Sequence, residues 1–349
     1  MAVVVSGRSI GIDHSPFIIA ELSGNHDGSL ETALSLVDAA AQAGVHAIKL
    51  QTYTADTMTL DLHNSDFRIE DPESLWNQSS LYELYDRAHT PWEWHRTIFE
   101  HARGKGLIAF STPFDRTAVD FLEELDVPCY KIASFENVDL PLIQYVAETG
   151  KPLIISTGMA SLAEIDDAVT SARDHGCREL VLLKCTSAYP APPENSNLAT
   201  IPDLRRTFAC EVGLSDHTLG IGVAVASVAL GATVIEKHIT MSRSDGAVDS
   251  AFSMEPWEME QLVIETGRAW SATGSVAYGP SEADRPSLKY RRSLYLVKDL
   301  RAGDTIDQDA IRAIRPGFGL APKHLGDVLG RQLVVDVQRG TPVSWELFV

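Results

Sequence analysis

The stretch FIIAELSGNHDGS, residues 17–29, decides the fold class. Its pattern predicts a buried strand at Phe17–Leu22, then a polar turn and a helix that begins after the capping residue Ser29. An open, doubly wound sheet is expected to carry a glycine-rich phosphate-binding loop after its first strand. Gly24 and Gly28 do not make the GxGxxG pattern of such a loop. The stretch therefore favours a closed barrel, with the open sheet as the alternative.

The rest of the chain repeats this strand-and-helix unit. Near-continuous apolar strands joined by amphipathic helices indicate a parallel sheet covered on both faces. Eight such strands are expected, which predicts a (β/α)₈ TIM barrel. The predicted strands are Phe17–Leu22, His46–Thr52, Leu107–Pro113, Cys129–Ser134, Pro152–Gly158, Leu180–Thr186, Glu211–Asp216 and Val234–Thr240.

Two segments depart from this repeat. Residues 53–91 form a long insertion after the second strand, and insertions of that size are usually lids or binding loops. The barrel is predicted to occupy residues 1–280, followed by a linker at 281–293 that is rich in proline and charge. Residues 294–349 form a separate small domain. Short strands are expected in it at Leu294–Val297 and Leu333–Val337.

Composition excludes several classes of function. The net charge of −19 over 349 residues argues against binding to nucleic acids or to anionic membrane surfaces. No apolar run is long enough to span a membrane, and the N-terminus lacks the pattern of a secretory signal. The four cysteines show no CxxC spacing, which favours free thiols in a reducing cytoplasm over disulfides. We therefore expect a cytoplasmic protein.

Polar residues follow every predicted barrel strand, and the active site of a barrel enzyme lies at that end of the strands. One such residue alone is explained equally well as a solvated rim residue. All eight strands together predict a catalytic constellation. The candidates are Glu21, Lys49, Gln51, Thr112, Lys131, Ser134, Glu136, Ser156, Ser187, Tyr189, Ser215, His217, Glu236 and His238.

The last two strands supply the most specific pair, His217 and His238, which can reach one metal ion. Neutral imidazole suits Mn²⁺, Fe²⁺ or Zn²⁺, and two histidines with open positions are typical of a catalytic site. A lone histidine is more often a core residue or a general base. Glu21 and Glu236 are expected to join the ligands or to orient a water molecule.

Lys49 and Lys131, surrounded by hydroxyl groups, form the other half of the site. Cations and short donors that converge in a barrel mouth are what a phosphate and a carboxylate require. The alternative is an aldolase in which one lysine forms a Schiff base. Two lysines beside a metal pair favour electrostatic binding of a dianion.

These residues, in this order, resemble the sialic acid synthase family over essentially the whole chain. The C-terminal domain, with RPGFGL at 315–320, is similar to the antifreeze-like (SAF) domain of that family. The motifs that carry the resemblance are IAELSGNHDGS (19–29), IKLQTYTADTMTL (48–60), FSTPFD (110–115), YKIAS (130–134), ISTGMA (155–160), GLSDHT (213–218) and IEKHIT (235–240).

Within the family, TYTADTMTLD, TPWEWH and ASFENVDLP look like the pseudaminic acid synthase branch. N-acetylneuraminate synthases typically read Gly-Pro-Asp-His after the last barrel strand. Here Asp249 is kept and the following histidine is Ser250. The rival assignments are an N-acetylneuraminate or legionaminate synthase and, outside this class, a pyruvate aldolase or a non-enzymatic sugar- or ice-binding protein.

The resemblance implies a role for each candidate. His217 and His238 would hold a divalent metal, Mn²⁺ first, with Mg²⁺ or Co²⁺ as alternatives, while Glu21 and Glu236 lie beside the reacting carbons. Arg315 would reach the sugar from the small domain, usually that of the partner in a domain-swapped homodimer. Phosphoenolpyruvate would be bound by Lys49, Thr112, Lys131, Ser134, Ser156, Ser187 and Ser215, and the sugar by Gln51, Glu136, Tyr189 and Asp249.

The implied reaction condenses phosphoenolpyruvate with an acetamido-sugar aldehyde. The metal would polarise the aldehyde, C3 of phosphoenolpyruvate would attack it, and water would add at C2 with Glu21 or Glu236 as base. Inorganic phosphate then leaves by C–O cleavage. On the pseudaminic branch the sugar is 2,4-diacetamido-2,4,6-trideoxy-L-altrose.

Overall fold

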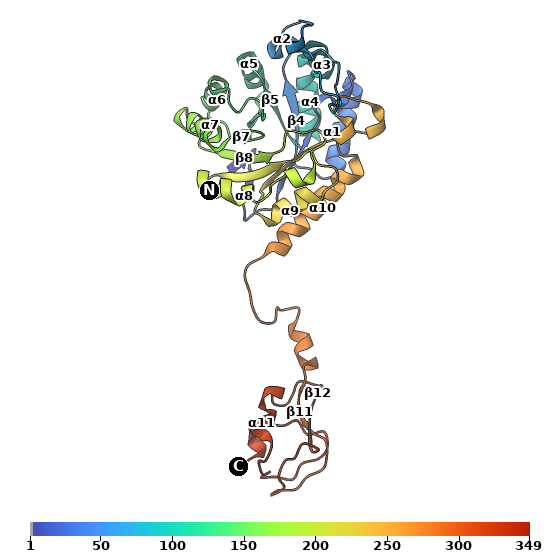
Figure 1. Cartoon of the computed structure of the whole chain (residues 1–349), viewed down its shortest axis with the longest axis vertical. Helices are drawn as coiled ribbons and strands as arrows, with labels where there is room; N and C mark the ends of the chain where they lie inside the picture. The colour runs from blue at the N-terminus through green and yellow to red at the C-terminus, as the bar shows by residue number, and fades with distance from the viewer. Residues whose placement is uncertain (1–2) are drawn as a thin grey trace. The chain divides into compact units, whose positions relative to one another are not determined.

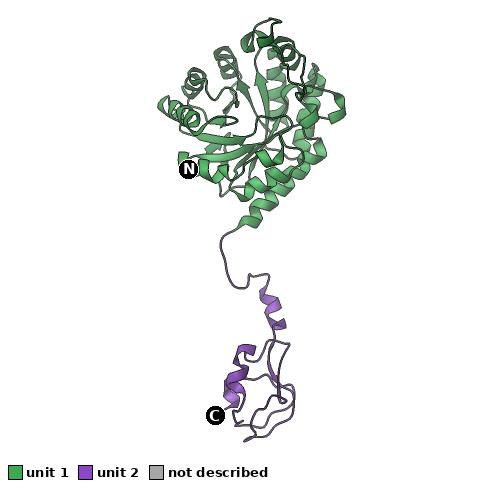
Figure 2. Ribbon diagram, viewed as in Figure 1, with its two compact units in different colours: residues 1–274 green, residues 275–349 purple. Residues whose placement is uncertain are grey.

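The computed structural model describes residues 3–349 and divides into two compact units, residues 1–274 and 275–349 (Figure 2). The first unit is a closed barrel of parallel strands, in the order β10-β3-β4-β5-β6-β7-β8-β9. The predicted (β/α)₈ barrel is confirmed, and each strand falls within its predicted run. The strands are β3 (Phe17–Glu21), β4 (Ala47–Thr52), β5 (Ile108–Pro113), β6 (Tyr130–Ile132), β7 (Leu153–Ser156), β8 (Leu180–Cys185), β9 (Glu211–Ser215) and β10 (Val234–His238).

Helices cover the outside of the barrel (Figure 1). The predicted N-cap Ser29 accepts a hydrogen bond from the backbone N–H of Thr32, and Ser161 forms a capping box with Glu164. Each helix buries one apolar stripe against the strands, and full burial of a large apolar side chain contributes about 1.5–3 kcal/mol. The covering helices are α1 (Leu30–Gln42), α4 (Trp92–Gly104), α5 (Arg116–Glu124), α6 (Leu140–Ala147), α7 (Leu162–Asp174), α8 (Thr200–Phe208), α9 (Gly222–Ala229) and α10 (Pro256–Thr273).

The insertion after β4 is partly helical. It contains α2 (Ala55–Met58), a 3₁₀ turn at Ser65–Phe67 and α3 (Leu81–Ala88). Ser80 caps α3 by accepting a hydrogen bond from the backbone N–H of Glu83. The segment therefore has secondary structure of its own, and it lies next to the strand ends that carry the candidate residues.

A short hairpin precedes the barrel and was not predicted. Its strands are β1 (Val3–Val5) and β2 (Arg8–Ile10), which pair antiparallel. The connection is Ser6–Gly7, and both residues have positive φ, 49° and 80°. A Ser-Gly pair between two strand-like runs is a turn signal, so this hairpin was recognisable from the sequence.

The second unit has a small apolar core of its own, which includes Leu294, Ile311 and Val343. Its two-stranded sheet pairs β11 (Ser293–Leu296) with β12 (Ile311–Ile314). The prediction of a strand at Leu333–Val337 was wrong, because Leu333 and Val337 form only isolated bridges. Val334 and Val335 between them are exposed, so the run does not alternate as a half-buried strand must.

Short helical segments complete the second unit. Residues 285–290 of the predicted linker form a 3₁₀ helix, and α11 (Leu325–Val328) lies further along the chain. All four cysteines are free thiols. No helix within residues 3–349 combines the length and the apolar character needed to cross a membrane.

The half-buried His46 is expected to make the free energy of unfolding depend on pH. The Nδ1 atom of His46 accepts the backbone N–H of Ile18 at 2.9 Å. Burial, with the charge of Arg8, lowers the pKa of His46 to about 4 from 6.5. Because the folded pKa lies below the unfolded one, the unfolded chain binds more protons in this range. The resulting stability is complete above about pH 6.5 and is lost as the pH falls towards 4.

The variant His46→Asn keeps an acceptor for the Ile18 N–H but cannot titrate. We expect its free energy of unfolding to depend less steeply on pH between 6.5 and 4, by up to about 1.4 kcal/mol per pH unit. Urea unfolding at a series of pH values measures this slope. An unchanged slope in the variant would show that His46 does not carry the effect.

Candidate active site

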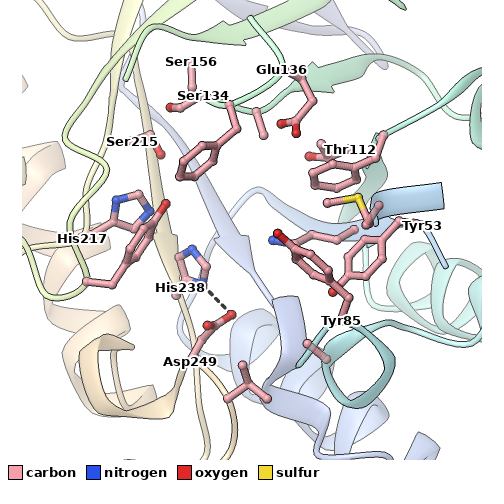
Figure 3. A pocket seen from close by; sticks show the side chains of 18 of the residues that line it. Tyr53, Tyr85, Thr112, Ser134, Glu136, Ser156, Ser215, His217, His238 and Asp249 are labelled. Atoms are coloured by element: carbon pink, nitrogen blue, oxygen red, sulfur yellow. Dashed lines mark ion pairs between the residues drawn. The ribbon is translucent and has the colours of Figure 1, made fainter. Parts of the chain in front are cut away.

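A cavity of about 410 Å³ opens at the carboxyl ends of the barrel strands. Its volume lies within the range typical of sites for small molecules. Figure 3 shows side chains from distant parts of the chain converging in it. The predicted residues that line it are Lys49, Gln51, Thr112, Lys131, Ser134, Glu136, Ser156, Tyr189, Ser215, His217, Glu236, His238 and Asp249.

Three predicted residues do not line this cavity directly. Glu21 is fully buried at the end of β3 and forms an ion pair with Lys49. Ser187 lies close to Ser134, since a Cβ atom built on Gly158 would be 2.4 Å from Ser134 Cβ and 2.9 Å from Ser187 Oγ. Only a glycine permits that approach. Arg315 belongs to the second unit, and its contact with the sugar stays a prediction.

His217 and His238 face the same space, with ring centroids 5.3 Å apart (Figure 3). The Nδ1 atom of His217 lies 3.0 Å from the carbonyl oxygen of Thr186, which can only accept, so Nδ1 carries the proton. Nε2 of the neutral ring then has a free lone pair. The Nδ1 atom of His238 lies 3.0 Å from Ser23 Oγ and 3.9 Å from a carboxylate oxygen of Asp249. Within residues 3–349 neither Nε2 atom has a hydrogen-bond partner at this site.

Two lysines and two carboxylates form a buried charged cluster beside the histidines. Lys49 pairs with Glu21, donates to Thr112 Oγ1 at 3.1 Å and lies 3.8 Å from Glu236. Lys131 donates to the carbonyl oxygen of Ile132 at 3.0 Å and lies 4.0 Å from Glu236. Lys131 is therefore held by weaker partners than Lys49, which leaves its ammonium group available to an anionic ligand.

The two carboxylates differ in their affinity for a proton. Burial raises the pKa of Glu21 to about 7 against the opposing charge of Lys49. Burial would also raise the pKa of Glu236, but Lys131 and Lys49 outweigh it and lower that pKa. Two carboxyl groups whose environments separate their pKa values in this way are suited to different acid–base roles. Glu236 stays ionised at neutral pH, whereas Glu21 can exchange a proton there.

Several buried polar atoms at the site lack a protein partner. They are Ser156 Oγ, Ser187 Oγ, Glu136 Oε2 and Glu236 Oε2. Buried polar groups in folded proteins are nearly always hydrogen-bonded, so a cluster of unpaired ones needs an explanation. A polar ligand in the cavity would supply partners for those that line it, Ser156, Glu136 and Glu236.

Comparison with known proteins identifies the family to which the chain belongs. The NeuB family model matches residues 36–278, and the SAF domain model matches residues 291–349. This chain belongs to the NeuB family. It is an enzyme, a transferase of the nonulosonic acid synthase family, and the predicted membership and enzyme class are confirmed.

Relatives of the NeuB chain cover almost its full length. A pseudaminic acid synthase of Campylobacter jejuni is 44% identical over 331 residues, which are 94% of this chain and 95% of the relative. An N,N'-diacetyllegionaminic acid synthase of Legionella pneumophila is 38% identical over 337 residues, or 95% and 94%. The crystal structure of N-acetylneuraminic acid synthetase from Leptospira borgpetersenii superposes with a TM-score of 0.74 at 31% identity, covering 82% of this chain and 95% of that one.

One supporting pair in this NeuB enzyme was not assigned from the sequence. Asp216 and Lys237 flank the two histidines in the chain but do not line the cavity. The buried ammonium group of Lys237 donates to Asp216 at 2.8 Å and to the carbonyl oxygens of Thr218 and Gly220 at 2.7 and 3.1 Å. These bonds fix the turn after β9, which carries His217. Lys237 thus positions a histidine without touching the cavity.

Replacing Lys237 with Met leaves the Asp216 carboxylate and two carbonyl oxygens buried without their donor. We expect the free energy of unfolding to fall by about 3–5 kcal/mol, the usual effect of breaking a buried ion pair from one side. Lys105→Met, which removes an exposed partner of Asp38, is the matched control and should change stability by about 1 kcal/mol or less. Urea denaturation compares the two, and equal effects would contradict the role given to Lys237.

Proposed function

We propose that the protein condenses phosphoenolpyruvate with 2,4-diacetamido-2,4,6-trideoxy-L-altrose and water, giving pseudaminic acid and phosphate. The observation that carries this proposal is the buried cluster of lysines and unpartnered hydroxyls beside a histidine pair, in a barrel of the NeuB family. Pseudaminic acid synthases of two bacterial species, at 40–44% identity, support this choice of product.

The lysine and hydroxyl half of the cavity suits a ligand with a phosphate and a carboxylate. Lys131 offers a buried charge whose nearest protein partners are the Ile132 carbonyl at 3.0 Å and Glu236 at 4.0 Å, and Ser156 offers a hydroxyl without a protein partner. Preorganised donors of this kind stabilise charge that develops on a departing phosphate. We assign this half to phosphoenolpyruvate.

The histidine pair fits a divalent metal, which we propose to be Mn²⁺. With metal–nitrogen bonds of about 2.1 Å, rings whose centroids lie 5.3 Å apart can share one ion. Among residues 3–349 no group of three or more His, Cys, Asp or Glu side chains is arranged to hold a metal, so substrate and water would complete the coordination. When bound, the ion supplies Lewis-acid polarisation of the sugar aldehyde.

The chain's own carboxylates then have separate tasks. Glu236 is held ionised by Lys49 and Lys131, so it can take a proton from the water that adds at C2. Glu21 can hold or release a proton near neutral pH. Both residues lie within the cluster formed around Lys49, where the reacting carbons of phosphoenolpyruvate would be placed.

The second candidate is a legionaminate synthase, favoured by the relative from Legionella pneumophila. The test measures phosphate release from phosphoenolpyruvate with a panel of acetamido-sugars, each with and without Mn²⁺. Preference for the L-altrose sugar supports the proposal. Preference for the sugar of N,N'-diacetyllegionaminic acid or for N-acetylmannosamine assigns the rival function, and free pyruvate as the preferred donor would indicate an aldolase.

A further inference from the structure

The cavity has two chemically different sides. The strand ends supply nearly all its charged and hydrogen-bonding groups, as described above. A second group of lining residues comes from the insertion after β4 and is apolar or aromatic. Those used below are Met58, Trp76, Leu81, Leu84, Tyr85 and Ala88. We call this group the apolar wall.

Helix α3 forms the centre of the apolar wall. Leu81, Leu84, Tyr85 and Ala88 occur at i, i+3, i+4 and i+7, which places them on one face of the helix. In most barrel helices such a stripe packs into the core. Here none of the four belongs to the main apolar cluster of the barrel, although Leu84 and Ala88 are buried, and all four line the cavity. The apolar face of α3 thus forms part of the cavity wall, while Ala88 also lies against Gly24.

The apolar wall is anchored to the sugar side of the cavity. The indole Nε1 of Trp76 donates to the carbonyl oxygen of Val248 at 3.0 Å. Its ring also packs against Tyr189, at 5.8 Å between centroids. Val248 precedes Asp249, and both Tyr189 and Asp249 line the cavity. Through Trp76 the wall therefore adjoins Tyr189 and Asp249, two of the residues assigned to the sugar.

We propose that the apolar wall selects sugars whose terminal carbon is a methyl group instead of a hydroxymethyl group. The inference rests on the proposed function and names the part of the site that recognises the 6-deoxy end. A methyl group buries apolar surface against Met58 and Leu81. A hydroxyl at the same place would lose its water, and the side chains of Met58 and Leu81 offer it no hydrogen bond in return.

The test compares kcat/KM for 2,4-diacetamido-2,4,6-trideoxy-L-altrose with that for its 6-hydroxy counterpart, by phosphate release. The unchanged enzyme should prefer the 6-deoxy sugar by about 10- to 100-fold. Leu81→Asn and Met58→Gln add a hydrogen-bonding group of similar size, and each should reduce the preference about tenfold. Leu60→Asn is the matched control, because Leu60 lies on the same insertion but is 60% exposed and does not line the cavity.

The outcomes separate the two proposals. Phosphate release with neither sugar would overturn the proposed function itself. Turnover of the 6-deoxy sugar with an unchanged preference in both wall variants would overturn the apolar wall as the selecting element. Thermal unfolding of each variant identifies any loss of folding. Met58→Gln, at a half-buried position, keeps the test decisive if Leu81→Asn does not fold.

Discussion

Replacement of His238 by Ala is expected to abolish turnover, lowering kcat by at least about a thousandfold, which corresponds to about 4 kcal/mol. The Nε2 atoms of His217 and His238 would hold the proposed metal. The Nδ1 atom of each ring is fixed by a neighbour, Thr186 for His217 and Ser23 for His238. Loss of one imidazole leaves a single protein ligand. His217→Ala should therefore behave in the same way.

Metal content gives a readout independent of activity. Each variant is dialysed against Mn²⁺, and bound metal is measured by elemental analysis. His101→Ala is the control, because His101 pairs with Asp38 on the outside of the barrel and should retain both metal and turnover. Full turnover in chelator-treated His238→Ala would remove the metal from the mechanism.

Lys131→Met should lower kcat/KM for phosphoenolpyruvate about a hundredfold or more, with a smaller effect on the KM of the sugar. The Lys131 ammonium is buried and has one carbonyl oxygen within hydrogen-bonding distance, that of Ile132. Without this charge, Glu236 keeps Lys49 as its neighbour, but the bound phosphate would lose a buried cation.

The control is another lysine at a strand end. Lys184, near the end of β8, donates to the carbonyl oxygen of Cys185 at 2.6 Å and does not line the cavity, so Lys184→Met should retain activity. The aldolase alternative is tested by treating the unchanged enzyme with pyruvate and borohydride, which would trap a Schiff base on a lysine. A covalent adduct on Lys131 or Lys49, detected by mass spectrometry, would refute electrostatic binding.

The barrel was predictable because its strands are buried on both faces. The sequence of such a strand is a continuous apolar run, and the polar residue that ends it is easily recognised, as Glu21 is at the end of β3. The sequence of the small second unit indicates its strands less clearly. Strand β12 covers only Ile311–Ile314, four residues that include the exposed Arg312. Four residues are too few to establish a period of two.

Within the site, the sequence could not separate residues that face the cavity from those that face away. Glu236, Lys237 and His238 are three consecutive polar residues, and only the first and third line the cavity. The ion pair between Lys237 and Asp216 depends on the direction that each side chain takes from the backbone. The spacing of Leu81, Leu84, Tyr85 and Ala88 predicts an amphipathic helix, but not whether its stripe faces a core or a ligand.

The position of α3 has a consequence for how such enzymes diversify. Its apolar residues lie outside the main apolar cluster of the barrel, and Leu81 and Tyr85 are only half-buried, so substitutions there remove less of the barrel's core packing than substitutions in its strands. The residues proposed to select the sugar are thus largely distinct from those that form the core of the barrel. Exchange of residues 53–91 between related synthases is accordingly the most direct route to altering which sugar is accepted while the condensation chemistry is retained.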